Sequence, residues 1–142
     1  MKKKIVVYLL TVLLALGAGF ALYGCSCNNN TGETTVPKGV GEMTTSPQES
    51  GGVTFTNYLV RITNDVDWNA LSKDEKQKII DYVFKQVYKK NEENGIRYFN
   101  VNAVTEDGVS VFQLDRQQNE VIVKKDGQHD YRIPAPVNPA AK

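Results

Sequence analysis

One long amphipathic stretch, residues 72–95, constrains the fold of this chain more than any other feature. Ser72 and Glu75 have the residue types and spacing of a capping box, in which each side chain accepts a hydrogen bond from the other residue's backbone amide. Asn94-Gly95 provides an end, because glycine readily adopts the left-handed conformation that terminates helices. The spacing predicts one helix that must bury an apolar face against another layer. The residues of that face are Ile79, Ile80, Val83, Phe84, Val87 and Tyr88.

Alternating stretches on both sides of this helix supply the second layer. After the helix, Asp107-Gly108 predicts a two-residue hairpin turn, which sets Ala103 opposite Phe112. The apolar residues of that hairpin then share one face: Phe99, Val101, Ala103, Phe112 and Leu114. Before the helix, one strand is predicted, with the alternating residues Tyr58, Val60 and Ile62.

A second hairpin is predicted at Asp126-Gly127. A two-residue loop there would put Asp130 and Arg132 beside two valines, so we favour a three-residue loop with Gly127 as a bulge. The pairs that this loop creates are Val121 with Tyr131 and Val123 with His129, and the apolar face that it forms is Val121, Val123, Tyr131 and Ile133.

The element order predicts an α+β domain over residues 53–133, with one helix packed on a four- to five-stranded antiparallel sheet. The order strand, helix and four strands resembles that of cystatin-like domains. Cystatin inhibitors carry a Gln-x-Val-x-Gly hairpin, whereas the corresponding turn here reads Val104-Thr105-Glu106-Asp107-Gly108-Val109. The resemblance therefore implies a topology and not protease inhibition.

The amino terminus carries an export signal, predicted over residues 1–24. Three lysines, residues 2–4, precede an apolar run over residues 5–22. The next four-residue motif, Leu22-Tyr23-Gly24-Cys25, resembles the lipobox of bacterial lipoproteins. That resemblance implies cleavage before Cys25 and acylation of Cys25, which anchors the chain in a lipid bilayer. The alternative is an uncleaved membrane helix.

Both alternatives place the domain outside the cytoplasm, because the lysines remain inside and the following residues cross. The lipoprotein resemblance implies the outer membrane in a Gram-negative cell and the outer face of the cell membrane in a Gram-positive one. Residues 25–52 are predicted to be the lipidated cysteine and a disordered tether, since 18 of the 27 residues after Cys25 are Ser, Thr, Asn, Gly or Pro. A second loose, Pro-rich tail is predicted over residues 134–142.

Charge and composition argue against several classes of function. The formal net charge of +1 becomes −2 without the three N-terminal lysines, so the domain lacks the concentrated basic face of a nucleic-acid binder. One histidine and two cysteines leave few residues for zinc sites or nucleophile relays, and we expect no cofactor. Once Cys25 carries lipid, Cys27 is left over and no intrachain disulfide can form.

Two motifs invite a metal or catalytic interpretation. Asp65-x-Asp67-x-Asn69 begins like a calcium loop, but Ala70 replaces the turn glycine and Lys76 replaces the bidentate glutamate. We interpret this segment as a polar turn before the helix and expect no metal. His129 has neither a second histidine nor a thiol partner, so we interpret it as an ordinary strand-end residue.

These observations predict a membrane-anchored, non-catalytic interaction domain that holds an envelope or surface protein. Envelope assembly and exclusion or immunity functions both remain open. The predicted partner-contact residues lie on the sheet face away from the helix: Tyr98, Val104, Val111 and Ile122. The alternative is a small-ligand-binding protein or weak hydrolase, which would require His129 to converge with Glu106 or Asp130 in a cleft.

Overall fold

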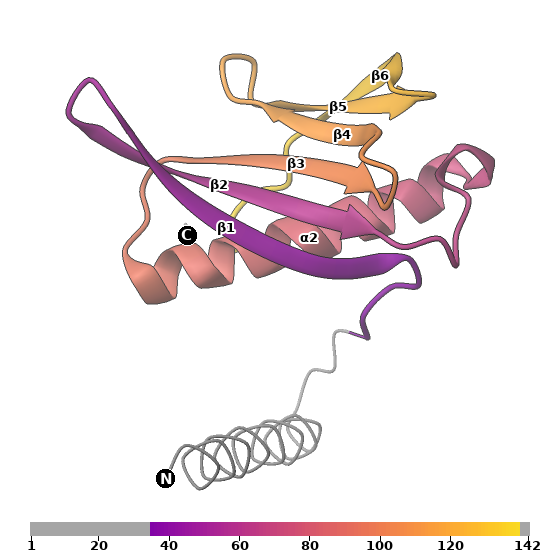
Figure 1. Cartoon of the computed structure of the whole chain (residues 1–142), viewed down its shortest axis with the longest axis horizontal. Helices are drawn as coiled ribbons and strands as arrows, with labels where there is room; N and C mark the ends of the chain where they lie inside the picture. Colours follow the sequence, from indigo (N-terminus) through magenta and orange to yellow (C-terminus); the bar gives the residue numbers. More distant parts are fainter. Residues whose placement is uncertain (1–34, 140–142) are drawn as a thin grey trace, which may run out of the picture. The chain divides into compact units, whose positions relative to one another are not determined.

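The computed structural model describes residues 35–139, in which one six-stranded sheet packs against one long helix (Figure 1). The fold class is α+β, and the predicted signal peptide and Cys25 lie outside the described residues. The strands lie side by side in chain order. In chain order the elements are β1 (Val40–Ser50), β2 (Val53–Ile62), the 3-10 helix η2 (Trp68–Ala70), α2 (Lys73–Asn94), β3 (Phe99–Thr105), β4 (Ser110–Asp115), β5 (Glu120–Lys125) and β6 (Gln128–Pro134).

The predicted helix and both of its ends are confirmed. The Glu75 amide donates to Ser72 Oγ at 3.2 Å, and the Ser72 amide donates to Glu75 Oε2 at 2.7 Å, so the capping box is complete. At the other end Gly95 adopts a left-handed conformation with φ 64°, and its amide donates to the Asn91 carbonyl. The buried residues of α2 include five of the predicted apolar face: Ile79, Ile80, Val83, Phe84 and Val87.

The prediction of a four- to five-stranded antiparallel sheet is wrong, because the sheet has six strands and is mixed. Strands β2 and β3 are parallel, and the other neighbouring strands are antiparallel. The physical reason is the helix between β2 and β3. It carries the chain back to the end of the sheet where β2 started, so that β3 runs in the same direction.

Strand β1 occupies part of the segment predicted to be a disordered tether, so that prediction is wrong over Val40–Ser50. The two glycines of the turn to β2, Gly51 and Gly52, have φ of 59° and 76°, as a tight two-residue hairpin requires. Strand β1 lies at the edge of the sheet, most of its side chains are exposed, and its sequence lacks an apolar alternation. Pro47 is tolerated there, since an edge strand has one side that forms no ladder bonds.

The β5–β6 hairpin differs from the predicted three-residue loop. Asp126 and Gly127 form a two-residue turn with φ of 50° and 74°, and Lys125 pairs with Gln128. The register then shifts by one residue between Val123 and Lys124, and this shift returns the apolar residues of β6 to the inner face. The predicted apolar face is therefore kept with shifted pairs, which are Val121 with Ile133 and Val123 with Tyr131.

The start of the predicted loose tail is also packed. Pro134 ends β6, and the next residue, Ala135, is only 6% exposed. The Ala135 amide donates to the Asn119 carbonyl at 3.0 Å, and Tyr88 Oη donates to the Pro136 carbonyl at 2.7 Å. Burial of Ala135 and hydrogen bonds to the backbone of this Pro-rich segment therefore hold it against the domain.

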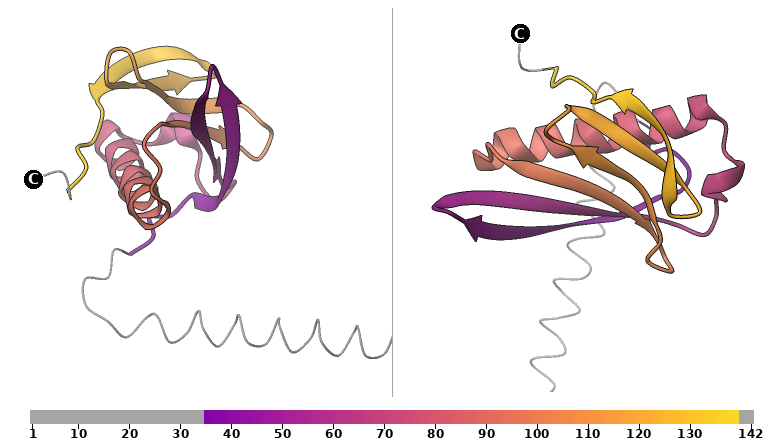
Figure 2. Two further views of the ribbon diagram at one scale, coloured as in Figure 1. Left: turned by 90° about the vertical axis from the view of Figure 1, so that its left-hand side faces the viewer. Right: turned by 90° about the horizontal axis from the view of Figure 1, so that it is seen from above.

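The sheet curves around α2, so that the core lies between the helix and the inner sheet face (Figure 2). Trp68 of η2 closes one end of this core, and its Nε1 donates to the Lys124 carbonyl at 2.9 Å. The largest fully buried side chains come from α2 and the strands: Tyr58, Phe84, Phe112, Ile62 and Ile80.

Candidate functional site

We call the sheet face that points away from α2 the outer face. In β2 the alternation is clear: Tyr58 and Val60 are fully buried, whereas Leu59 between them is 38% exposed. Arg61 is exposed as well. Within residues 35–139 no helix covers the outer face (Figure 2).

Three of the four predicted partner-contact residues lie on the outer face. Tyr98, immediately before β3, is 45% exposed, and Val104 and Ile122 are half-buried. Val104 lies beside Arg61 in the parallel pair β2–β3, and Ile122 lies opposite Gln113. Their role as partner contacts stays a prediction.

Val111 is not on the outer face, so its assignment to the contact surface is wrong. Ala103 pairs with Phe112 as predicted, but Val104 pairs with Ser110, which leaves Val111 as an extra residue in β4. Such a bulge interrupts the alternation of side chains. Val111 is consequently 4% exposed and belongs to the hydrophobic core together with its neighbour Phe112.

Two aromatic rings and one arginine gather at the end of the outer face near the β1–β2 turn. We call Phe55, Tyr98 and Arg116 the aromatic–arginine cluster. The ring centroids of Phe55 and Tyr98 are 5.9 Å apart. The Arg116 guanidinium carbon lies 5.3 Å from the Phe55 centroid and 5.6 Å from the Tyr98 centroid, so one cation is within cation–π distance of both rings.

Polar side chains surround this cluster and continue across the sheet. They bond to one another between neighbouring strands, which fixes their positions without consuming all of their donors and acceptors. The bonds are Asn100 Nδ2 to Asn57 Oδ1 at 2.9 Å, Ser110 Oγ to Asn102 Oδ1 at 2.9 Å and Lys124 Nζ to Gln113 Oε1 at 2.9 Å.

The carboxylates of this face are held by one arginine. Arg132 Nη1 donates to Asp115 Oδ2 at 2.9 Å and to Glu120 Oε2 at 3.2 Å. The hydrogen bond from Arg132 is the main cause of a lowered pKa at Asp115, and the same two carboxylates raise the pKa of Arg132. Among residues 35–139 the other two arginines of this face, Arg61 and Arg116, form no ion pair, so the face keeps uncompensated positive charge.

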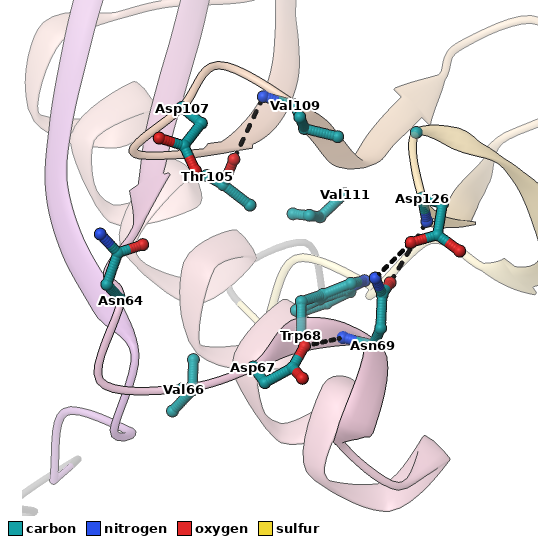
Figure 3. Close-up of a pocket in the computed structure, with 11 residues that line it drawn as sticks. Asn64, Val66, Asp67, Trp68, Asn69, Thr105, Asp107, Val109, Val111 and Asp126 are labelled. Atoms are coloured by element: carbon teal, nitrogen blue, oxygen red, sulfur yellow. Dashed lines mark hydrogen bonds between the residues drawn. The ribbon is translucent and has the colours of Figure 1, made fainter.

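A cavity of about 510 Å³ opens at the other end of the sheet (Figure 3). The segment between β2 and α2 forms one side, and the β3–β4 and β5–β6 turns form the others. Asn69 ties two sides together, because its Nδ2 donates to Asp126 Oδ1 at 2.7 Å and its Oδ1 accepts from the Asp126 amide. Valines and carboxylates line the cavity: Val66, Val109, Val111, Asp67, Asp107 and Asp126.

The calcium-like motif forms a polar turn in the structure. Asp67 Oδ1 accepts from the Asn69 amide and caps η2, and Asp65 accepts a hydrogen bond from the Thr63 hydroxyl. These side chains therefore serve local backbone geometry. Within the described part of the chain, no group of three or more His, Cys, Asp or Glu residues could hold a metal ion.

The residues of the hydrolase alternative do not line this cavity. His129 lies on β6 opposite Lys124, and Glu106 lies in the β3–β4 turn; neither is among the lining residues, and nor is Asp130. A second cavity of about 400 Å³ lies beside the β1–β2 turn and also lacks them. Its lining includes Val53, Thr54, Asn94, Ile96, Arg97 and Tyr98.

Phe55, Leu59 and Arg116 belong to the outer face but were missed in the sequence. The sequence indicates two of them. Phe55 and Leu59 are odd-numbered positions of β2, whereas the predicted core residues of that strand are even-numbered, so the two side chains point to the other face. Arg116 had no such signal, since it lies in a turn that only the folded sheet brings beside Phe55.

Comparison of the chain with protein-family models, with curated proteins and with solved structures finds no match. Within residues 35–139, no helix is both long and apolar enough to cross a bilayer.

Proposed function

We propose that the chain is a membrane-anchored lipoprotein whose domain is a non-catalytic, extracytoplasmic binding module. The anchor rests on the N-terminal lysines, the apolar run and the lipobox-like motif that ends at Cys25. The binding role rests chiefly on one observation, the exposure of aromatic, aliphatic and arginine side chains together on an uncovered sheet face.

The position of β1 limits how far the domain extends from the anchor. Strand β1 begins at Val40, so 14 residues separate Cys25 from the first strand. Even a fully extended segment of that length spans only about 50 Å. An acylated Cys25 would therefore confine the domain to the vicinity of the bilayer, where it can engage an envelope or surface protein.

Fatty-acid labelling tests the anchor. The wild-type chain should incorporate an alkyne-tagged palmitate analogue and fractionate with membranes, whereas Cys25→Ser should do neither. Cys27→Ser is the matched control, because it removes the other cysteine of the chain and should label normally. Equal labelling of Cys25→Ser and wild type would contradict the proposed anchor.

Site-specific photo-crosslinking in intact cells tests the contact surface. A photoreactive amino acid at Tyr98 should give a defined crosslinked product that depends on Cys25. The same amino acid at Lys89, which is exposed on α2, should not give that product. A product formed equally from both positions would contradict the outer face as the contact surface.

A small-ligand-binding function is the second candidate, favoured by the cavity of about 510 Å³. That volume falls in the range of small-molecule sites, and the lining combines apolar and polar groups. Ligand-observed NMR screening would test it with Val109→Trp as a cavity-filling variant. A true ligand of this cavity should bind the wild type and lose affinity for the variant.

A further inference from the structure

We propose that the aromatic–arginine cluster is a recognition site for a carboxylate side chain on an acidic segment of a protein partner. This inference rests on the proposed function, since it names the chemistry of the partner that the outer face would bind. Three observations carry it: the position of Arg116 beside two aromatic rings, the hydrogen bonds that the nearby carboxylates already accept, and the composition of the surrounding surface.

The two rings hold the Arg116 cation beside them without neutralising its charge. Its guanidinium carbon lies 5.3 Å from the Phe55 centroid and 5.6 Å from the Tyr98 centroid, and the two ring planes are inclined by 54° to each other. Within residues 35–139 the N–H donors of Arg116 form no ion pair, and a planar fork of donors matches the two oxygens of a carboxylate. Because the rings already restrict the side chain, less entropy is lost when an anion binds.

The carboxylate closest to Arg116 in sequence already accepts hydrogen bonds from other groups. Asp115 accepts from Arg132 Nη1 and from the backbone amides of Gln117 and Gln118. Glu120 accepts from the same arginine. Within the described residues Arg116 therefore has no internal counter-ion, and its charge is available to an external one.

The surrounding surface favours a protein segment with spaced acidic residues. Tyr98 and Leu59 expose apolar area, and Asn57 and Asn100 add amide donors and acceptors, a combination typical of protein interfaces. A second unpaired arginine, Arg61, lies six positions along β2 from Phe55, about 20 Å away. Two separated cations on one sheet face fit carboxylates distributed along an extended chain.

The cluster lies away from the point at which the chain enters the domain. The chain enters the domain at Val40, whereas Phe55 pairs with Gln48 near the far end of β1. Eight strand positions separate Val40 from Gln48, which corresponds to about 26 Å. The cluster therefore lies far along the domain from the point at which the anchored segment joins it.

Fluorescence anisotropy with the full-length chain in detergent micelles tests the proposal. The probe is a short labelled peptide that alternates glutamate and valine, and its glutamine analogue is the control ligand. We expect saturable, salt-sensitive binding of the glutamate peptide only. Arg116→Gln should weaken that binding about tenfold. Arg116→Lys should weaken it by less, because lysine keeps the charge but lacks the planar fork.

Arg97→Gln is the matched control variant, because Arg97 is an exposed arginine next to Tyr98 in sequence and contacts no aromatic ring within residues 35–139. It should bind the peptide like the wild type. Circular dichroism of each variant should match the wild-type spectrum, since Arg116 is exposed.

Several outcomes would overturn the proposal. These are equal binding of the glutamine peptide, unchanged affinity in Arg116→Gln, and no saturable binding of the glutamate peptide. Binding of polyphosphate or of phosphatidylglycerol vesicles in place of the glutamate peptide would also overturn it, because the occupant would then belong to another class. The titration does not depend on acylation, so failure of the Cys25 anchor and failure of this site are separate results.

Discussion

Tyr58 on β2 and Asn91 on α2 are joined by a buried hydrogen bond in which Tyr58 Oη donates to Asn91 Oδ1 at 2.6 Å. The same asparagine accepts with its backbone carbonyl from the amides of Gly95 and Ile96. One residue thus joins the last turn of the helix to the sheet and to the chain reversal that leads into β3. Burial raises the pKa of the Tyr58 hydroxyl, which stays neutral as a donor.

Tyr58→Phe should lower the free energy of unfolding by about 1–3 kcal/mol, because it leaves the buried Asn91 oxygen without its donor. Urea denaturation monitored by circular dichroism measures this change. Tyr82→Phe, on a half-buried position of the same helix as Asn91, is the control and should change stability by less than about 0.5 kcal/mol. Equal effects of the two substitutions would contradict the importance of the Tyr58–Asn91 bond.

The pH dependence of stability offers a related test. Because the pKa of Tyr58 is higher in the folded than in the unfolded chain, its contribution is fully present below the unfolded pKa, near 10. Stability should therefore fall as the pH rises above about 10. This alkaline loss should be smaller in Tyr58→Phe, as measured by urea midpoints at increasing pH.

The helix could be predicted from sequence because local chemistry defines it. Ser72 and Glu75 satisfy each other's amides, and Gly95 is the residue type that readily adopts a left-handed φ. The core face of the later strands was also predictable, since buried residues alternate along β3 and β5. The sequence pattern was therefore sufficient to predict those elements whose structure is determined by residues close together in sequence.

The remaining features depend on contacts between segments that are distant in sequence. Strand β1 has no apolar pattern, and only Gly51-Gly52 indicates a hairpin there. The bulge that buries Val111 is a one-residue irregularity that an alternation cannot locate. The contact between Arg116 and Phe55 requires β2, β3 and β4 to lie side by side, and the parallel pairing of β2 with β3 arises from the helical crossover.

Asp115 should make the domain sensitive to acid. Its folded pKa is lowered chiefly by the hydrogen bond from Arg132, so its contribution is present above the unfolded pKa of about 4 and is lost as the pH falls through the folded value. Asp115→Asn should therefore flatten the decrease of stability below about pH 4 in thermal melts. Glu93→Gln, at an exposed site on α2, should keep the wild-type profile. Identical profiles for all three chains would contradict this role.

Trp68 should be a second determinant of stability. It is 3% exposed, its ring lies 5.6 Å from that of Phe112, and its Nε1 donates to the Lys124 carbonyl. Trp68→Phe removes the donor and part of the packed volume, which should cost about 1–3 kcal/mol. Urea unfolding followed by circular dichroism measures the loss, because the substitution removes the only tryptophan of the chain. A loss below about 0.5 kcal/mol would contradict the role of this side chain.

Gly39 distinguishes an ordered first strand from a flexible tether. Its φ is 93°, it is buried, and a Cβ atom there would lie 2.4 Å from Val66 Cγ2. Gly39→Ala should therefore destabilise the domain by about 1–3 kcal/mol through backbone strain and steric overlap. Gly51→Ala is the matched control, because that glycine also has a positive φ but, among the described residues, no atom lies within 4 Å of the added Cβ, so it should cost less.

A double variant separates the two causes at Gly39. Val66→Ala removes the atoms that a new Cβ would overlap, so combining it with Gly39→Ala should recover the steric part of the loss while the strain from φ remains. The four urea midpoints of this cycle measure the coupling between the two sites. In a flexible tether Gly39→Ala would leave stability unchanged and the coupling would be zero, and that result would contradict the packing of this segment against Val66.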